Sequence, residues 1–484
     1  MREGVTTRHQ MLLAGRWTDS SETITVRNPF NGEVIGEVAK AGRPELERAA
    51  DATVRAFETT RRLSSGARHS MLQAASGGLI RRKEEIARTI ALEAGKPIKL
   101  ARGEVDRAAH TFSASADEAR RIGGEVIPLD VTAATEGRLG LTRRFPLGPV
   151  LAITPFNFPL NLTAHKLAPA LAAGNPFVHK PASATPLTAL LLGEILLEAG
   201  APPEAVSVLP AASSDAERLV ADDRFRLLTF TGSPDVGWRL REKAGRKRVL
   251  LELGGNAAVV IHEDADLERA LERMVAGAFA YSGQVCISVK RIYVHEPVYA
   301  DFARRFVERA KALKLGNPLD EAVDLGPMLD DAAAARVESW VAEALAGGAK
   351  ALCGARRDGR FYAPTVLTDV SPSMKVHECE VFGPVVNLYP YRDFEEALRQ
   401  VNDSPFGLQA GLFTRDAGRI FRAFEALEVG GVIVDDAPTF RVDHMPYGGE
   451  KASGLGREGV RYAIEEMTQL RLLALKLNQE PPGG

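Results

Sequence analysis

The chain has 484 residues, of which 45% are apolar and 26% are charged, a balance typical of soluble globular proteins. Because one hydrophobic core cannot organise a chain of this length, we expect two or three domains. The formal net charge of −2 gives no reason to expect nucleic acid or an anionic membrane as a partner.

Cysteine usage and hydropathy predict a cytoplasmic protein. The three cysteines, Cys286, Cys353 and Cys379, are too few for a disulfide framework and fit a reducing compartment. The apolar run 11–14 is too short for a signal peptide, and the run 187–197 is interrupted by Glu194, so we expect no membrane span. The cysteines and the nine histidines show no metal-ligand spacing, so no metal site is predicted.

The N-terminal third is predicted to be largely helical. The first 30 residues are polar and contain short strand-like pieces such as 24–26. Apolar residues spaced three and four apart then indicate helices from residue 44 to about residue 123. The segment 124–148 differs, because 132–135 has the composition of a turn and 139–145 alternates like an exposed strand. We interpret it as a β-excursion from the helical body.

Two series of short apolar segments follow, and helical patterns such as 187–200 and 234–244 separate them. The first series comprises 150–153, 176–179, 205–209 and 227–230, and the second comprises 257–261, 291–294, 385–389 and 431–434. This alternation predicts an α/β fold of two doubly wound domains that are joined near Leu253. The tail 470–477 alternates weakly and is expected to pair with the excursion, and 481–484 is expected to be disordered.

Two glycine-containing segments are candidates for a phosphate site. Residues 454–459 match G-x-G-x-x-G, but the motif requires a preceding strand and these residues follow a loop-like sequence, so we interpret them as a flexible active-site rim. The segment 230–237 is better placed, because it follows a predicted strand and opens a helix at Pro234. Its free N–H groups and the Ser233 hydroxyl could hold a pyrophosphate, and Lys180, one β/α unit earlier, could donate to ribose hydroxyls.

Cys286 is the candidate nucleophile. It follows a helical stretch and lies in the polar turn Ser282-Gly283-Gln284-Val285-Cys286, where nearby N–H groups could lower its pKa. Cys353 and Cys379 are interpreted as small buried apolar residues.

Glu252 and Asn157 each allow two interpretations. Glu252 interrupts the apolar strand 249–253, and it either forms an ion pair with Arg246 or Lys247 or is a base whose pKa an apolar pocket raises. Asn157 follows a predicted strand, and it either stabilises a turn or donates its amide to an oxyanion together with the Cys286 N–H. A thiol, a carboxylate and an amide together predict the oxidation of an aldehyde through a thioester.

Seven motifs occur in an order that resembles the NAD(P)-dependent aldehyde dehydrogenase superfamily over essentially the whole chain. They are Pro155-Phe156-Asn157-Phe158-Pro159, Lys180-Pro181, Phe230-Thr231-Gly232-Ser233, Glu252-Leu253-Gly254-Gly255, Gly283-Gln284-Val285-Cys286, Glu380-Val381-Phe382-Gly383-Pro384 and Pro446-Tyr447-Gly448-Gly449. The resemblance implies a Rossmann-like cofactor domain (1–123 and 149–252), a catalytic domain (253–450) and an oligomerisation flap (124–148 and 468–484). It also implies a homodimer or homotetramer that acts on a small-molecule aldehyde.

The resemblance assigns a role to each motif. The Cys286 thiolate attacks the aldehyde, Asn157 and the Cys286 N–H hold the oxyanion, and Glu252 activates the water that releases the acid. Lys180 binds the adenosine ribose, Ser233 the pyrophosphate and Glu380 the nicotinamide ribose, with Phe382 nearby. The complete set of predicted cofactor-binding residues is Ile153, Thr154, Pro155, Phe156, Lys180, Ser183, Gly232, Ser233, Gly254, Glu380 and Phe382.

Departures from the family pattern bear on the cofactor. Many NAD-preferring members carry Glu where this chain has Ser183, and a carboxylate there would repel a 2′-phosphate. We therefore predict that NADP is accepted as well as NAD, and a preference for NADP stays open. Position 379, which is often acidic in the family, is Cys here.

The substrate is predicted from the segment 436–445. It is similar to the branch that acts on small polar or anionic aldehydes, such as lactaldehyde, glyceraldehyde 3-phosphate and phosphonoacetaldehyde. Arg441, with Arg107 and His444, could hold an anionic group, and the alternative for Arg441 is a structural ion pair.

Three other functions compete with this prediction. A CoA-acylating dehydrogenase on the same fold needs no water-activating base, so Glu252 favours the non-acylating reaction. A catalytically silent protein on this fold would have no reason to keep Cys286, Glu252 and Asn157 together. A thiol hydrolase needs a histidine partner for its cysteine, and no histidine has an evident pairing role in the sequence.

Overall fold

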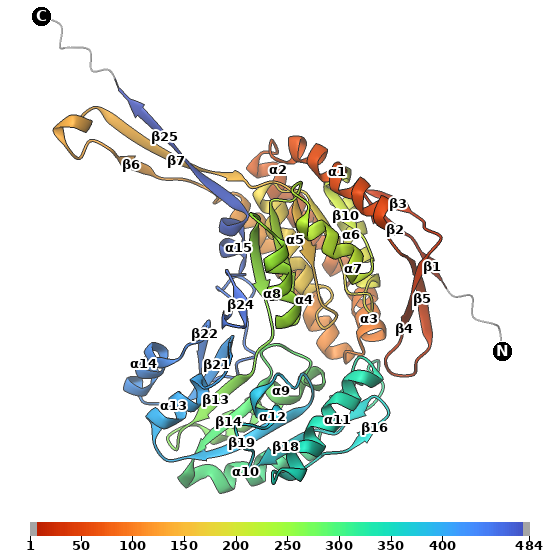
Figure 1. Cartoon of the computed structure of the whole chain (residues 1–484), viewed down its shortest axis with the longest axis vertical. Coiled ribbons are helices and arrows are strands. Elements are labelled where there is room, and N and C mark those ends of the chain that lie inside the picture. The colour runs from red at the N-terminus through yellow and green to blue at the C-terminus, as the bar shows by residue number, and fades with distance from the viewer. Residues whose placement is uncertain (1–6, 478–484) are drawn as a thin grey trace, which may run out of the picture.

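The computed structural model describes residues 7–477 and contains two large sheets, one in each half of the molecule (Figure 1). The first sheet has the strand order β24-β12-β11-β8-β9-β10-β2-β3. Its strands are β2 (Met11–Leu13), β3 (Arg16–Thr18), β8 (Val150–Ile153), β9 (Phe177–Lys180), β10 (Val206–Val208), β11 (Leu227–Thr231), β12 (Arg248–Glu252) and β24 (Gly454–Leu455). The predicted α/β class is confirmed, and every strand predicted between 150 and 230 is present.

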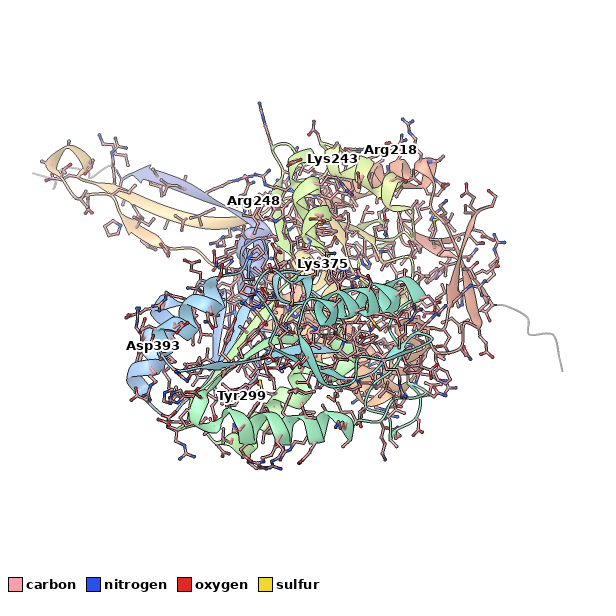
Figure 2. All side chains as sticks on the ribbon, turned by 60° about the horizontal axis from the view of Figure 1, so that its bottom comes forward. Arg218, Lys243, Arg248, Tyr299, Lys375 and Asp393 are labelled. Carbon is pink, nitrogen blue, oxygen red and sulfur yellow. The ribbon has the colours of Figure 1, made fainter. Side chains whose placement is uncertain are left out.

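The centre of the first sheet is parallel, because β10, β9, β8, β11 and β12 pair in that order with parallel register. Strands buried on both faces need helices on both sides, which explains their continuous apolar sequence. The crossover helices are α5 (Asn161–Ala173), α6 (Leu187–Glu198), α7 (Ser213–Ala221) and α8 (Pro234–Lys243). In Figure 2, Arg218 and Lys243 lie on the outer side of α7 and α8, where both are exposed.

The predicted helical region consists of four helices. They are α1 (Arg43–Thr60), α2 (Ser65–Arg81), α3 (Lys83–Ala94) and α4 (Ile98–Ala119), and α2 and α4 pack against α5. Short strands β1 (Arg8–His9), β4 (Thr23–Arg27) and β5 (Val34–Ala39) form a separate sheet beside them. None of the helices within residues 7–477 is long and apolar enough to cross a membrane.

The second sheet has the order β15-β18-β19-β14-β13-β21-β22, and only β15 is antiparallel to its neighbour. Its strands are β13 (Ala257–Ile261), β14 (Val289–His295), β15 (Lys350–Cys353), β18 (Thr365–Thr368), β19 (Val385–Tyr391), β21 (Gln409–Phe413) and β22 (Gly431–Val434). Helices α9 (Leu267–Phe279), α10 (Glu296–Lys311), α11 (Asp331–Ala346), α12 (Lys375–Glu378), α13 (Phe394–Asn402) and α14 (Ala417–Ala426) accompany it. Leu253 lies between β12 and β13, so the predicted junction falls between the two sheets.

The chain then returns to the first sheet. β24 pairs antiparallel with β12, where Gly454 lies opposite Glu252, and α15 (Val460–Glu466) packs against α4 and α5. The predicted division into domains leaves this return unassigned, and that division stays a prediction. The expectation of a flexible rim at 454–459 is wrong, because Gly454 belongs to a paired strand and Glu458 is buried.

The β-excursion and the tail form one three-stranded flap. β7 (Arg138–Pro146) pairs antiparallel with β6 (Val126–Pro128) on one side and with β25 (Thr468–Lys476) on the other. Figure 1 shows the flap projecting away from both sheets. The predicted strand 139–145 and its pairing with the tail are confirmed. Residues 478–484 of the predicted flap, and the expected disorder at 481–484, lie outside the described residues.

Candidate active site

Cys286 lies in a constrained loop between α9 and β14. Tyr281 and Ser282 in this loop have positive φ angles of 51° and 53°, a conformation that costs energy in residues other than glycine. Their side chains keep it in place, because the Tyr281 hydroxyl donates to the Ala94 carbonyl (2.7 Å) and the Ser282 hydroxyl donates to the Gly326 carbonyl (2.6 Å). The nucleophile loop is therefore attached to two segments that are distant from it in the sequence.

The Cys286 thiol is half-buried, and its Sγ lies 3.1 Å from the Tyr447 hydroxyl. Burial raises the pKa of Cys286 to about 11, against the opposing effect of the hydrogen bond from Tyr447. The sequence led us to expect a lowered pKa from nearby N–H groups, and in this structure the cost of burying the thiolate outweighs any such effect. The carboxylates of Glu380 and Glu252 add to the same upward shift of the pKa.

Glu252 ends β12 as a buried carboxylate, 4% exposed. Its Oε2 has no hydrogen-bond partner within residues 7–477, and the neighbouring Lys247 faces Asp223 instead (3.8 Å). Burial, and next the nearby Glu458 carboxylate, raise the pKa of Glu252 well above its usual value. An ion pair with Arg246 or Lys247 is therefore not what holds this side chain.

Asn157 follows β8 and reaches the nucleophile loop. Its Nδ2 donates to the carbonyl of Gln284 (3.0 Å), two residues before Cys286. An amide nitrogen carries two N–H groups, so one remains for another acceptor. The three predicted catalytic residues thus come from three separate segments. The Asn157 side chain is hydrogen-bonded to the loop that contains Cys286.

The predicted cofactor residues of the first sheet lie at its carboxyl edge. Ile153 is opposite Lys180, and Thr231 is opposite Glu252, so the loops that contain Thr154, Pro155, Ser183 and Gly232 start at one edge. Ser233 is the N-cap of α8 and makes no capping bond with its side chain, and Pro234 begins the helix as predicted. Lys180 is 6% exposed, and burial lowers its pKa to about 8, whereas Ser183 is exposed.

The second sheet brings Glu380 and Phe382 to the same edge. Glu380 Oε1 accepts a hydrogen bond from the Gly255 N–H (3.1 Å), and burial raises the pKa of Glu380 to about 7. A side chain at Gly254 would overlap with the Glu380 carboxylate and would displace it. Phe382 and Phe156 meet edge to face with ring centroids 6.0 Å apart, which places the two halves of the predicted cofactor site together.

These groups fit a nicotinamide dinucleotide. The N-terminus of α8 and the unused Ser233 hydroxyl suit a pyrophosphate. The Lys180 ammonium and the Glu380 carboxylate suit the hydroxyls of two riboses.

Arg441 is engaged in an ion pair. Its Nη2 lies 3.1 Å from Glu458 Oε2, and its Cζ lies 3.6 Å from the centroid of the Tyr447 ring. Glu458 also pairs with Lys166 (2.9 Å). Of the two interpretations of Arg441, the structural ion pair is the one that the contacts favour.

Arg107 and His444 contact different residues from those that Arg441 contacts. Arg107 Nη2 donates to Asp443 Oδ1 (2.8 Å), and the same oxygen accepts from His165 Nε2 (2.9 Å) and Asn161 Nδ2 (3.2 Å). The exposed ring of His444 lies 6.0 Å from that of His110. The sequence therefore predicted three substrate residues, but it missed Asp443, the carboxylate around which this side of the site is arranged.

Comparison with known proteins identifies the family of the chain. Residues 17–473 match the model of the aldehyde dehydrogenase family. The chain belongs to the aldehyde dehydrogenase family. A 3-sulfolactaldehyde dehydrogenase of Priestia megaterium is 46% identical over 471 residues, which are 97% of this chain and 98% of that protein. A succinate-semialdehyde dehydrogenase (NADP+) of Escherichia coli is 39% identical over 478 residues, 97% of this chain and 98% of that protein.

Solved structures agree with this assignment. Aldehyde dehydrogenase 21 from Physcomitrella patens, in complex with the reaction product succinate, has a TM-score of 0.96 and 45% identity and covers 98% of this chain and 99% of its own. A glyceraldehyde-3-phosphate dehydrogenase of Methanocaldococcus jannaschii, complexed with NADP, has a TM-score of 0.91 and 39% identity, with 94% and 100% covered. The predicted enzyme class, an NAD(P)-dependent aldehyde dehydrogenase, is confirmed.

The structure of this aldehyde dehydrogenase also contains a buried pair that the sequence did not reveal. Lys96 forms an ion pair with Glu104, and both side chains are at most 1% exposed. Glu104 Oε1 accepts from the N–H groups of Leu160 (2.9 Å) and Asn161 (3.1 Å), which begin α5. Lys96 Nζ lies 3.6 Å from the ring centroid of Phe158 and 4.7 Å from that of Tyr281. The pair therefore joins the Asn157 loop to the nucleophile loop.

Two histidines also come together beyond what sequence spacing indicated. One ligand atom from each of His262, Glu263 and His295 lies within 4.8 Å of the others, at the ends of β13 and β14. The two imidazole rings are stacked with centroids 4.4 Å apart. His262 and His295 are 33 positions apart in the sequence, so spacing along the chain could not predict that they meet.

Proposed function

We propose that this aldehyde dehydrogenase oxidises an aldehyde to the carboxylic acid with NAD(P)+ through a thioester on Cys286. The observation that carries the proposal is the placement of Glu252, a buried carboxylate whose Oε2 has no hydrogen-bond partner in the described chain, close enough to raise the pKa of the Cys286 thiol. Such a carboxylate is costly unless it is used, and a base beside a nucleophile is the arrangement that thioester hydrolysis requires.

The first step forms a covalent bond between Sγ of Cys286 and the aldehyde carbon. The thiol gives up its proton to solvent water, the thiolate adds to the carbonyl carbon, and the carbonyl oxygen becomes an alkoxide. The second N–H of the Asn157 amide and the main-chain N–H of Cys286 hold this alkoxide. A nicotinamide held by the candidate cofactor residues would supply the hydride acceptor, and loss of hydride from the carbon bonded to Sγ would leave a thioester.

The second step hydrolyses the thioester. Glu252, as the carboxylate, takes a proton from a water molecule as its oxygen attacks the acyl carbon, and the Cys286 thiolate leaves. The raised pKa of Glu252 brings its protonation closer to neutral pH, which suits a base that must also release its proton. A CoA-acylating reaction has no use for this group.

The deciding experiment uses Cys286→Ser and assays acid formation without CoA. The parent enzyme is expected to convert aldehyde to free acid with stoichiometric reduction of the cofactor, and the variant is expected to lose this activity. Acid formation by Cys286→Ser at the parent rate would refute the proposal. Product release only in the presence of CoA would establish the acylating alternative.

The cofactor proposal is that NADP is accepted. Ser183 is exposed and places no carboxylate where a 2′-phosphate would lie, while Lys180 offers a cation nearby. Two of the relatives described above carry NADP in their names or were solved with it. The test is the ratio of kcat/KM for NADP and NAD, and a preference for NAD of about a hundredfold, roughly 2.7 kcal/mol, would contradict it. Ser183→Glu is expected to shift the ratio toward NAD.

The substrate proposal is a small aldehyde with an anionic group. The names of the relatives include sulfolactaldehyde and succinate semialdehyde, and one solved relative holds succinate. Arg107, whose side chain is 33% exposed, and the exposed His444 support the proposal. Arg441 contributes less, because its side chain is only 5% exposed and is held by Glu458 and by the Tyr447 ring. A panel of carboxylated, sulfonated, phosphorylated and neutral aldehydes with Arg107→Met tests this, and an unchanged KM for every anionic aldehyde would refute it.

The assembly proposal is a homodimer or homotetramer that forms through the flap. Leu470, Leu472 and Leu473 of β25 are 57%, 58% and 54% exposed. Apolar side chains clustered on a projecting strand indicate a surface that another protein surface covers.

A further inference from the structure

Lys290 is a buried lysine in β14, four residues after Cys286, and the catalytic steps above do not use it. It is 1% exposed. Within residues 7–477, both of its hydrogen bonds go to main-chain carbonyls, that of Gly283 (3.2 Å) and that of Gly383 (2.7 Å). Burying an ammonium group costs free energy, so a lysine at this position needs an explanation beyond packing.

The two carbonyls belong to the two loops that hydride transfer must bring together. Gly283 is part of the nucleophile loop, three residues before Cys286. Gly383 follows Glu380 and Phe382, the predicted ribose-binding carboxylate and its neighbour. The loops are in close contact, because a side chain at Gly283 would overlap with the Gly383 carbonyl. Two carbonyl oxygens that approach each other repel unless a donor lies between them, and the Lys290 ammonium supplies that donor.

Other groups already hold each loop separately. Tyr281, Ser282 and Gln284 attach the nucleophile loop to the carbonyls of Ala94 and Gly326 and the N–H of Leu329. Arg336 donates to the Val381 carbonyl in the other loop (3.1 Å). Lys290 is different, because its single ammonium bonds both loops at once and thereby fixes the distance between them.

We infer that Lys290 is a positioning residue that fixes the Cys286 loop relative to the Glu380–Phe382 loop, and that it acts on hydride transfer and not on the reactivity of the thiol. The inference rests on the proposed function. Burial lowers the pKa of Lys290 to about 7, and the nearby Glu380 carboxylate opposes this change and keeps the ammonium form accessible.

The test separates the reaction that needs both loops from one that needs only the nucleophile loop. Aldehyde oxidation requires that the Cys286 thiol and the nicotinamide ring are correctly positioned relative to each other. Hydrolysis of p-nitrophenyl acetate requires only that Cys286 displaces p-nitrophenolate and that water, activated by Glu252, cleaves the acetyl thioester. Since a misplacement of about 1 Å can slow a reaction by roughly 100-fold, Lys290→Met is expected to lower the single-turnover rate of aldehyde oxidation by about 10- to 100-fold. Its rate of ester hydrolysis is expected to match the parent.

Ser288→Ala provides the matched control. Ser288 is 1% exposed, lies two residues from Lys290 and donates to carbonyls of α9, Gly277 (3.2 Å) and Ala278 (3.1 Å). Its hydroxyl bonds neither Gly283 nor Gly383, and the main-chain N–H that bonds the Val285 carbonyl is kept in the variant, so loss of the hydroxyl should leave the ratio of the two activities unchanged. Thermal unfolding of all variants shows whether each is folded, and Lys290→Gln, which keeps one donor, replaces the Met variant if that variant does not fold.

The outcomes are distinct. Equal loss of oxidation and ester hydrolysis, or no loss of either, would overturn the inference. Absence of ester hydrolysis in the parent enzyme, or its persistence in Cys286→Ser, would instead refute the proposed role of Cys286.

Discussion

Within residues 7–477, the hydrogen-bond partner of the Cys286 thiol is the Tyr447 phenol. Its pKa of about 11 means that the reactive thiolate is a small fraction of the cofactor-free enzyme at neutral pH. The Tyr447 hydroxyl, 3.1 Å from Sγ, opposes this effect, and Arg441 packs on the face of the same Tyr447 ring. The Arg441 charge also lowers the pKa of Cys286 directly, although the effect of burial is larger.

The first prediction concerns pH. Because the raised pKa leaves most of the thiol protonated, alkylation of Cys286 by iodoacetamide in the cofactor-free enzyme should accelerate about tenfold per pH unit between about pH 7 and pH 9. Mass spectrometry of the Cys286 peptide measures the rate. Tyr447→Phe removes the hydrogen bond that lowers the pKa, and it should slow alkylation at a given pH. A rate that is already constant across this range would mean that the thiol has a low pKa.

The second prediction concerns Glu252. Glu252→Gln keeps the size of the side chain and removes the base, so the thioester should form and then persist. One equivalent of reduced cofactor should appear rapidly, and steady-state turnover should fall by about 10²- to 10⁴-fold. The acylated Cys286 peptide should be visible by mass spectrometry. Loss of the initial burst together with turnover would show that Glu252 acts before hydride transfer.

At the scale of elements, a buried ion pair at the start of α4 holds two loops of the candidate active site together. Lys96 precedes α4 and Glu104 lies within it, and their pair holds the start of α5 and contacts the rings of Phe158 and Tyr281. The site therefore depends on the helical first third of the chain, although that region contains none of the residues proposed to react.

The third prediction tests this pair. Glu104→Gln leaves the Lys96 ammonium buried without its partner, which should lower the free energy of unfolding by about 3–5 kcal/mol. The double variant Lys96→Met with Glu104→Gln should recover part of this loss. Glu343→Gln is the control, since its pair with Lys375 (2.6 Å; Figure 2) is half-exposed and is expected to contribute about 0–1 kcal/mol. Denaturant titration measures all three, and equal effects at the buried and exposed pairs would contradict the prediction.

Sequence patterns predicted the elements of both sheets well, because a strand buried on both faces needs a continuous apolar run. They failed where the partner of a segment is distant in the chain. Residues 454–459 follow a loop-like sequence, yet Gly454 pairs with Glu252, and Glu458 is buried against Lys166 and Arg441. The reacting residues were predicted because family motifs mark them. Asp443, Lys96 and Lys290 were not, because a charged residue becomes informative only when its buried neighbours are known.

At the scale of the whole molecule, the exposed leucines of the flap lead to the fourth prediction. Leu470→Lys with Leu472→Lys places two charges on one face of β25, and burying them between subunits would be unfavourable. Light scattering should report a smaller assembly than that of the parent. Ile80→Lys on α2, where the side chain is 51% exposed, is the control and should leave the assembly unchanged. An unaltered mass for the flap variant would place the subunit contact elsewhere.

The pairing of β7 with β25 brings Arg144 against Thr468, 324 positions further along the chain (3.2 Å). Synthesis on the ribosome proceeds from the N-terminus, so β7 emerges long before the strand that completes its sheet. Until β25 is synthesised, one edge of β7 in the β6–β7 hairpin has no strand of the same chain to pair with. Association through the flap, as proposed, therefore requires that β25 has already been synthesised and has paired with β7.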